Sequence, residues 1–287
     1  DSIISVFNNS NINEYISVFQ FEDEGIKHTR DYKISKLNHP YALDYIFSGH
    51  IDLLEKLEGF VPSEQEYLCE NACATSDAYK LKDLLIDLDE EYSEEYLKII
   101  NTGTIDKWTS KWGEKEMTYL GDKYLRPVVS REKFVKLFRN SYSEKSIKQK
   151  IILKGLNLLD ACLDIKGCII PGKSTLIITA KDIFYLKFIM AILNSPITFF
   201  YLRERYPSSS YNQGTTFTKD MINNLPLPRI SKEEEKEVVF LVDEILRVKN
   251  LSLKEGKISE LEEDLNDIIM GGFELTEDQT KRILDSI

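Results

Sequence analysis

The sequence predicts an α+β fold in which helices pack on a mixed β-sheet and a helical tail closes the chain. Three apolar or β-branched runs lie between residues 149 and 179, as expected for strands. Helical periodicity replaces them from Asp182 to Leu193. Capping signatures then recur in residues 231–287, so the chain should end in helices.

The strand region is expected to form a β meander, because glycine or Pro-Gly separates its three runs at Gly155, Gly167 and Pro171-Gly172. The runs are Lys150–Leu153, Leu158–Ile165 and Thr175–Thr179.

Helix boundaries are marked by capping residues. Ser195 and Pro196 fit the start of a helix that runs to about Tyr206. Capping boxes are expected at Ser231 with Glu234 and at Thr276 with Gln279, with a further helix between them from near Ile258 to Gly271. An earlier helical pattern spans Pro40–Leu57 and ends at Gly59.

Three regions follow from these patterns. Residues 1–100 should form an N-terminal α/β region, residues 101–230 a central domain, and residues 231–287 the helical tail. The chain begins at Asp1 rather than at a methionine, so we expect it to be part of a longer protein.

Composition is that of a soluble globular protein, with 42% apolar and 11% aromatic residues in 287. No apolar run is long enough to span a membrane, and no signal peptide is recognisable. The four cysteines, Cys69, Cys73, Cys162 and Cys168, are expected to be reduced thiols in a cytoplasmic protein rather than zinc ligands.

Charge is segregated along the chain. The net charge is -11, but residues 104–230 alone carry +10, with 21 basic and 11 acidic side chains. Residues 1–103 carry -13 and residues 231–287 carry -8. A basic surface flanked by acidic ends is the simplest consequence, and such a surface is typical of proteins that bind nucleic acid.

One stretch, Gly167–Ser174, matches the phosphate-binding loop pattern G-x-x-x-x-G-K-[ST]. That loop requires a helix directly after it, whose N-terminus faces the phosphate. Here Thr175–Thr179 follows, which is β-branched, and Pro171 removes an amide from the loop. A hairpin between two strands is therefore the expected structure.

Other catalytic patterns are missing, including G-x-S-x-G and H-E-x-x-H. Asp160 and Asp164 share a face of a predicted strand and are expected to be solvated. The sequence therefore shows no active site.

Several stretches, in order, resemble the C-terminal half of adenine-N6 DNA methyltransferases of type I and type IIG restriction-modification systems, including the Taq-type specificity domain. The resemblance covers roughly residues 70–287. It is carried by Ala72–Lys82, Asn101–Val128 with Trp108 and Trp112-Gly113, Lys150–Gly155, Leu186–Tyr201 followed by Leu225-Pro226-Leu227-Pro228, and Leu261–Glu277.

The sequence departs from that family at its catalytic half. The Asn/Asp-Pro-Pro-Tyr/Phe motif and the glycine-rich loop for S-adenosylmethionine are both missing. Asn194-Ser195-Pro196-Ile197 is not a substitute, because it lies between helices and lacks the second proline and the aromatic residue. The resemblance thus implies a target-recognition part that holds no cofactor, while the parent protein would use S-adenosylmethionine. It leaves open whether that parent also carries an endonuclease.

Double-stranded DNA and a catalytic methyltransferase domain, in the same chain or in a partner subunit, are the implied partners. Basic side chains of the central segment would contact phosphates: Lys107, Lys111, Lys115, Lys123, Arg126, Lys148 and Lys154. Aromatic, amide and guanidinium groups would read bases: Trp108, Trp112, Arg203, Arg205, Tyr211, Asn212 and Gln213. Solubility is the alternative role for each lysine, and core packing for the two tryptophans.

Two other functions remain as alternatives. The chain could be a protein-interaction module that uses its acidic ends, in which case it would not bind DNA. It could also be a nucleotide-binding protein that uses Gly167–Ser174, in which case Lys173 would be essential.

Overall fold

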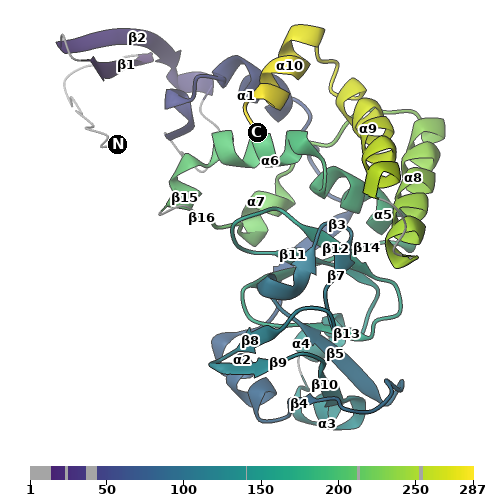
Figure 1. Cartoon of the computed structure of the whole chain (residues 1–287). Coiled ribbons are helices and arrows are strands. Elements are labelled where there is room, and N and C mark those ends of the chain that lie inside the picture. Colours follow the sequence, from purple (N-terminus) through teal and green to yellow (C-terminus); the bar gives the residue numbers. More distant parts are fainter. Residues whose placement is uncertain (1–13, 23–24, 37–43, 140, 212–213, 252–254) are drawn as a thin grey trace.

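Two four-stranded sheets lie one above the other in an elongated molecule (Figure 1). The computed structural model describes residues 14–22, 25–36, 44–139, 141–211, 214–251 and 255–287. The upper sheet has the order β12 (Ala161–Asp164), β11 (Lys150–Lys154), β14 (Thr175–Ala180), β3 (Tyr67–Asn71). The lower sheet has the order β13 (Ile169–Pro171), β5 (Tyr96–Ile100), β10 (Pro127–Ser130), β4 (Ile86–Asp87). Together with the helices, the two sheets confirm the α+β class.

The three predicted strand runs are confirmed as β11, β12 and β14, but the predicted meander is wrong. β11 lies between the other two strands and pairs antiparallel with both. β14 therefore neighbours β11 and not β12, because the chain between β12 and β14 leaves the upper sheet.

That departing segment is β13, which pairs parallel with β5 of the lower sheet. The hairpin predicted at Gly167–Ser174 is therefore wrong, since this stretch crosses to the other sheet and returns. The strand predicted after Ser174 is confirmed as β14, so no helix follows the sequence pattern of a phosphate-binding loop.

A buried ion pair holds the point where the chain changes sheets. Lys150 on β11 is fully buried, and its Nζ donates to the Asp164 carboxylate and to the carbonyls of Ser146 and Lys148. Asp164 also accepts from the backbone N–H groups of Cys168 and Ile169, at 3.2 and 2.9 Å. The expectation that Asp164 is solvated is wrong, because its carboxylate closes the turn into β13.

Gly167 is required at the same turn for two reasons. Its φ of +60° lies in the left-handed region. A Cβ atom at this position would also lie 2.1 Å from the carbonyl oxygen of Ile147. No side chain can therefore replace it without moving the backbone.

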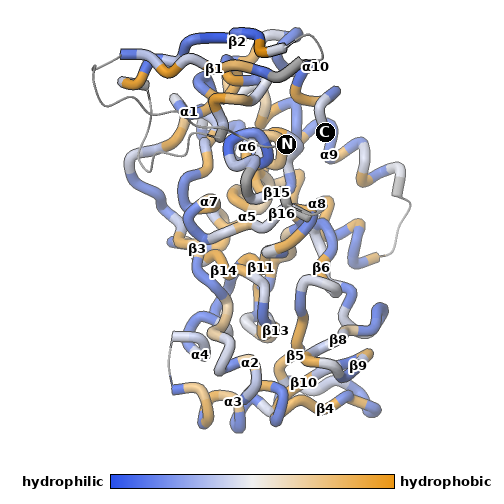
Figure 2. Tube along the Cα trace, turned by 90° about the vertical axis from the view of Figure 1, so that its left-hand side faces the viewer, coloured by the Kyte–Doolittle hydropathy of each residue, from blue (hydrophilic) through white to orange (hydrophobic). Residues whose placement is uncertain are grey.

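Hydrophobic helices cover the upper sheet. α5 (Ile183–Leu193) packs against β11, β12 and β14 on one side and α8 (Lys232–Asn250) on the other. α6 (Pro196–Arg205) contacts α1 (Ile51–Glu58) and α10 (Glu277–Asp285), and α9 (Glu255–Gly271) packs along α8. Figure 2 shows apolar stretches along β11 and β14 above and along β5 and β10 below.

The predicted capping boxes at Ser231 and Thr276 are both confirmed. The helix predicted over Pro40–Leu57 is only partly confirmed. α1 begins at Ile51, and a separate 3-10 turn covers Asp44–Phe47. Residues 40–43 of the predicted helix lie outside the described residues.

Smaller elements complete the two parts of the molecule. The lower sheet is covered by α2 (Thr75–Lys82), α3 (Arg131–Leu137) and α4 (Ser141–Ser146), which share its apolar cluster or contact its strands. Short hairpins are formed by β6 (Ile105–Asp106) with β7 (Thr109–Ser110), β8 (Met117–Tyr119) with β9 (Asp122–Tyr124), and β15 (Ser210–Tyr211) with β16 (Gly214–Thr215). β1 (Tyr15–Glu22) and β2 (Gly25–Lys33) form a ribbon at the opposite end of the molecule from the lower sheet (Figure 1). Short 3-10 turns cover Ile34–Lys36, Thr102–Thr104 and Pro207–Ser209.

The outer edge of the upper sheet is occupied by a side chain. Asn223, the last residue of α7 (Lys219–Asn223), accepts from the backbone N–H of Cys69 at 2.7 Å. Its amide also donates to the carbonyl of the same residue at 3.0 Å. The exposed edge of β3 is therefore paired at its centre by an amide rather than by another strand.

No single helix of the described residues is long and apolar enough to cross a membrane. α5 and α6 pass that test only as a pair, and they are bent by 65° at the break between them.

Replacing Lys150 with methionine should lower the free energy of unfolding by about 3–5 kcal/mol, because the Asp164 carboxylate would remain buried without its cation. Lys154→Met is the matched control, since the Lys154–Asp160 pair lies on the same strand with side chains 16% and 14% exposed, against 0% and 2%. Urea denaturation measures both variants. Equal losses for the two would show that burial of the Lys150 pair has no special role.

Candidate nucleic-acid interface

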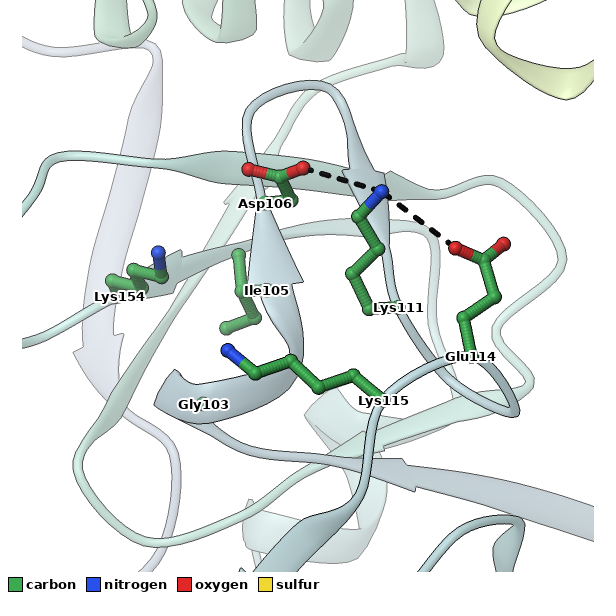
Figure 3. Close-up of a pocket in the computed structure, with 7 residues that line it drawn as sticks. All are labelled: Gly103, Ile105, Asp106, Lys111, Glu114, Lys115 and Lys154. Carbon is green, nitrogen blue, oxygen red and sulfur yellow. Dashed lines mark ion pairs between the residues drawn. The ribbon is translucent and has the colours of Figure 1, made fainter. Parts of the chain in front are cut away.

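An open groove beside the β6–β7 hairpin brings together three of the lysines predicted to contact phosphate. Figure 3 shows Lys115 extending across it below Ile105, while Lys154 enters from the other side. The lining residues are Gly103, Ile105, Asp106, Lys111, Glu114, Lys115 and Lys154. In the folded chain, residues 111–115 therefore lie near the end of β11.

A tight turn and a hairpin shape the groove. Asn101 caps the 3-10 turn Thr102–Thr104 with a complete capping box. The β6–β7 hairpin follows, and its turn places Trp108 in the left-handed region with a φ of 71°. The backbone N–H of Lys111 then donates to the carbonyl of Thr104, which returns the chain to the groove.

The groove lysines differ in how strongly neighbouring carboxylates hold them. The Nζ atom of Lys111 lies 3.5 Å from Asp106 and 3.6 Å from Glu114, which is longer than a good hydrogen bond (Figure 3). Lys154 is bonded to Asp160. Lys115 is exposed and forms no ion pair with any residue that the structure describes. Lys115 and Lys111 are therefore the groove lysines most readily available to bind a phosphate.

The other predicted phosphate contacts lie outside the groove. Lys107 pairs with Glu262 of α9 at 2.9 Å, so an acidic side chain of the C-terminal helices lies against the β6–β7 hairpin. Lys123 pairs with Glu116 at 2.8 Å, and this bond raises the pKa of the lysine. Lys148 is exposed on a separate hollow between β3 and α4.

The two tryptophans have different environments. Trp108 is 2% exposed, and its Nε1–H donates to Glu262, so its edge is closed to a base. Core packing, the alternative role, therefore describes Trp108. Trp112 is only partly buried, and its Nε1–H donates to the carbonyl of Pro127 at 2.8 Å.

Two cations lie against the ring of Trp112. The Lys98 Nζ is 4.4 Å from the indole centroid, and the Arg126 guanidinium carbon is 5.5 Å away. Tyr92 packs edge-on against the same indole. Sequence reasoning selected Arg126 and Trp112 but missed Lys98, because Lys98 lies in the acidic first 103 residues.

Arg203 and Arg205, predicted base readers, lie at the end of α6. Arg205 is 5% exposed, bonds Glu58 at 2.5 Å and lies 4.2 Å from the Tyr45 ring. Arg203 donates to the carbonyl of Ser286. Both guanidinium groups therefore tie α6 to its neighbours.

The β15–β16 hairpin carries the remaining predicted base readers. Tyr211 pairs with Gly214 in it, while Asn212 and Gln213 lie outside the described residues. The hairpin is anchored near the groove, because the N–H of Asn157 donates to the Thr215 carbonyl at 2.7 Å and Leu156 bridges to Thr216. The hairpin base therefore lies close to the end of β11 that carries Lys154.

Metal-binding clusters are not found in the part of the chain that the structure describes: no three histidine, cysteine or acidic side chains are grouped to hold an ion. The four cysteines are free thiols. Burial raises the pKa of the Cys162 thiol to about 12 and that of Cys73 to about 11.

No protein-family model matches this chain, and no curated protein matches its sequence. Among solved structures, it is similar to the type IIG restriction endonuclease BpuSI, at 12% identity and a TM-score of 0.45 over 87% of this chain and 36% of that one. It is also similar to the type IIL restriction-modification enzyme MmeI in complex with DNA, at 11% identity and a TM-score of 0.47 over 95% of this chain and 40% of that one. The chain spans less than half the length of either structural neighbour.

Replacing Arg205 with methionine should lower the free energy of unfolding by on the order of 3 kcal/mol, since Glu58 would lose its buried cation. Arg203→Met, at a side chain that is 30% exposed, should cost less. Chemical denaturation of the two variants tests this. If the Arg205 variant is as stable as the wild-type chain but binds DNA more weakly, Arg205 contacts DNA and its role is not structural.

Proposed function

We propose that this chain binds double-stranded DNA and serves as the target-recognition part of a restriction-modification adenine-N6 DNA methyltransferase. The observation that carries the proposal is the groove, where Lys111, Lys115 and Lys154 converge in a chain whose positive charge is concentrated in residues 104–230. Lys111 makes only long contacts to carboxylates, and Lys115 forms no ion pair with a described residue, so both can bind phosphates of the DNA backbone.

The recognition step would divide between the groove and the neighbouring hairpin. The lysines would fix the position of the duplex through its phosphates, which carry no sequence information. Tyr211, Asn212 and Gln213 would then read the base edges; of these, the structure describes only the backbone of Tyr211, which pairs with Gly214. Trp108 and Arg205 are left out of this role, because both are buried and already bonded.

Methylation itself would need a second domain. The chain has neither the Asn-Pro-Pro-Tyr-type motif nor the glycine-rich loop of the family it resembles, so a catalytic domain in the same protein or a partner subunit would bind S-adenosylmethionine and the target adenine. The assembly would act in the cytoplasm.

Duplex binding should weaken steeply with salt, because each phosphate contact releases counterions. The double variant Lys111→Ala/Lys115→Ala should reduce the slope of log K against log salt by about 1.8, which is about 0.9 per lost contact. Fluorescence anisotropy with a labelled duplex of mixed sequence, between low and moderate salt, measures the slope.

Lys232→Ala/Lys236→Ala provides the charge-matched control, because both lysines are exposed on α8 and neither forms an ion pair with a described residue. Its slope should equal that of the wild-type chain. If the wild-type chain does not bind duplex DNA even at low salt, the proposed function is wrong. If the two double variants behave alike, the groove is not the interface.

A further inference from the structure

Lys98 lies on the face of β5 that also carries Ile100, which packs in the apolar cluster that contains Ile152 and Cys162 of the upper sheet. Lys98 alternates along β5 with the buried Leu97 and Ile99, so its side chain leaves the apolar cluster of the lower sheet. Its Nζ atom lies 4.7 Å from the centroid of Tyr92 and 4.4 Å from that of Trp112. Aromatic faces attract cations, so the two rings hold the ammonium group in place.

The side chains of Lys98 and Arg126 form no ion pair with a carboxylate among the residues with a described placement, although the Asp87 carboxylate accepts from the backbone N–H of Arg126 at 2.5 Å. Burial lowers the pKa of Lys98, and the charges of Lys166 and Arg126 lower it further. Asp164 and Cys168 act in the opposite direction, but the Asp164 carboxylate is already bonded to Lys150.

A partly buried cation without an anion is costly, and a bound anion would offset that cost. The groove lysines and this cluster are also close in sequence, since Trp112 directly follows Lys111. The Nε1–H bond of Trp112 to the Pro127 carbonyl fixes the indole on which both cations rest. The indole and the two cations are therefore held in contact by interactions within the chain.

We propose that Lys98 and Arg126, held on the ring of Trp112, form a binding site for a phosphate group of the nucleic-acid backbone. This proposal rests on the proposed function for the source of the phosphate, and it adds Lys98, a residue outside the basic segment of the sequence. The site would extend the DNA-contacting surface from the groove to the face of β5 that contacts Trp112.

The first experiment compares Lys98→Met with Lys236→Met in duplex binding. Methionine preserves much of the side chain and removes a cation that is costly to bury, so the variant should fold. Lys98→Met should reduce the slope of log K against log salt by about 0.9, the loss of one phosphate contact. Lys236→Met, with the same change in net charge, should leave the slope unchanged.

A second measurement reports on the amine itself. Limited acetylation of the wild-type chain near pH 8, followed by mass spectrometry, should modify Lys98 readily in the free protein because its pKa is lowered. Saturating duplex should protect Lys98 several-fold more than it protects Lys236. Equal labelling of Lys98 with and without bound DNA, or equal slopes for the two variants, overturns the site while leaving the proposed function standing.

Inorganic phosphate separates failure of the site from failure of the function. The indole N–H resonance of Trp112 should shift on titration with millimolar phosphate in the wild-type chain and not in Lys98→Met. If the wild-type chain binds no duplex but this shift is seen, the site binds phosphate from another source and only the proposed function falls. If neither duplex nor phosphate has an effect, both are wrong.

Discussion

The buried pair of Lys150 and Asp164 is the interaction on which the arrangement of the two sheets depends. The lysine side chain ties β11 to the end of α4 through the carbonyl of Ser146, while the aspartate holds the turn that leads into β13. An ion pair this deeply buried gains little net stability over apolar residues, but arrangements of the chain that separate its two partners are disfavoured, because each would leave a buried charge without its partner. It therefore specifies where the chain leaves one sheet for the other, and this sets the relative position of the groove and the Trp112 cluster.

Local features of the fold were predictable from the sequence, whereas strand partners were not. The capping boxes at Ser231 and Thr276 and the strand after Ser174 depend on neighbouring residues, so patterns of a few positions identify them. The parallel pairing of Ile169–Pro171 with β5 joins residues about seventy positions apart. Nothing in the apolar run itself distinguishes a hairpin from a strand that crosses to a second sheet.

In the candidate site, too, the sequence indicated which residue types are present but not which distant partners they contact. Charge counting selected a segment in which Lys111, Lys115 and Lys154 line one groove. Charge counting could not distinguish these three lysines from Lys107, which forms an ion pair with Glu262 in α9. It also could not show that Arg205 is buried against Tyr45. Lys98 was missed for the opposite reason: the average charge of an acidic segment conceals one cation that the sheet directs toward Trp112.

The amide of Asn223 on the edge of β3 has a consequence for how these molecules behave toward one another. An unprotected edge strand offers free N–H and C=O groups to any extended chain, which leads to sheet growth between molecules. Because Asn223 occupies both groups of Cys69, the upper sheet ends where α7 packs, and a second molecule cannot continue its hydrogen-bond ladder there. A single side chain thus takes the place of a neighbouring strand at the centre of this edge, where strand addition between two copies of an elongated, sheet-containing protein would otherwise begin.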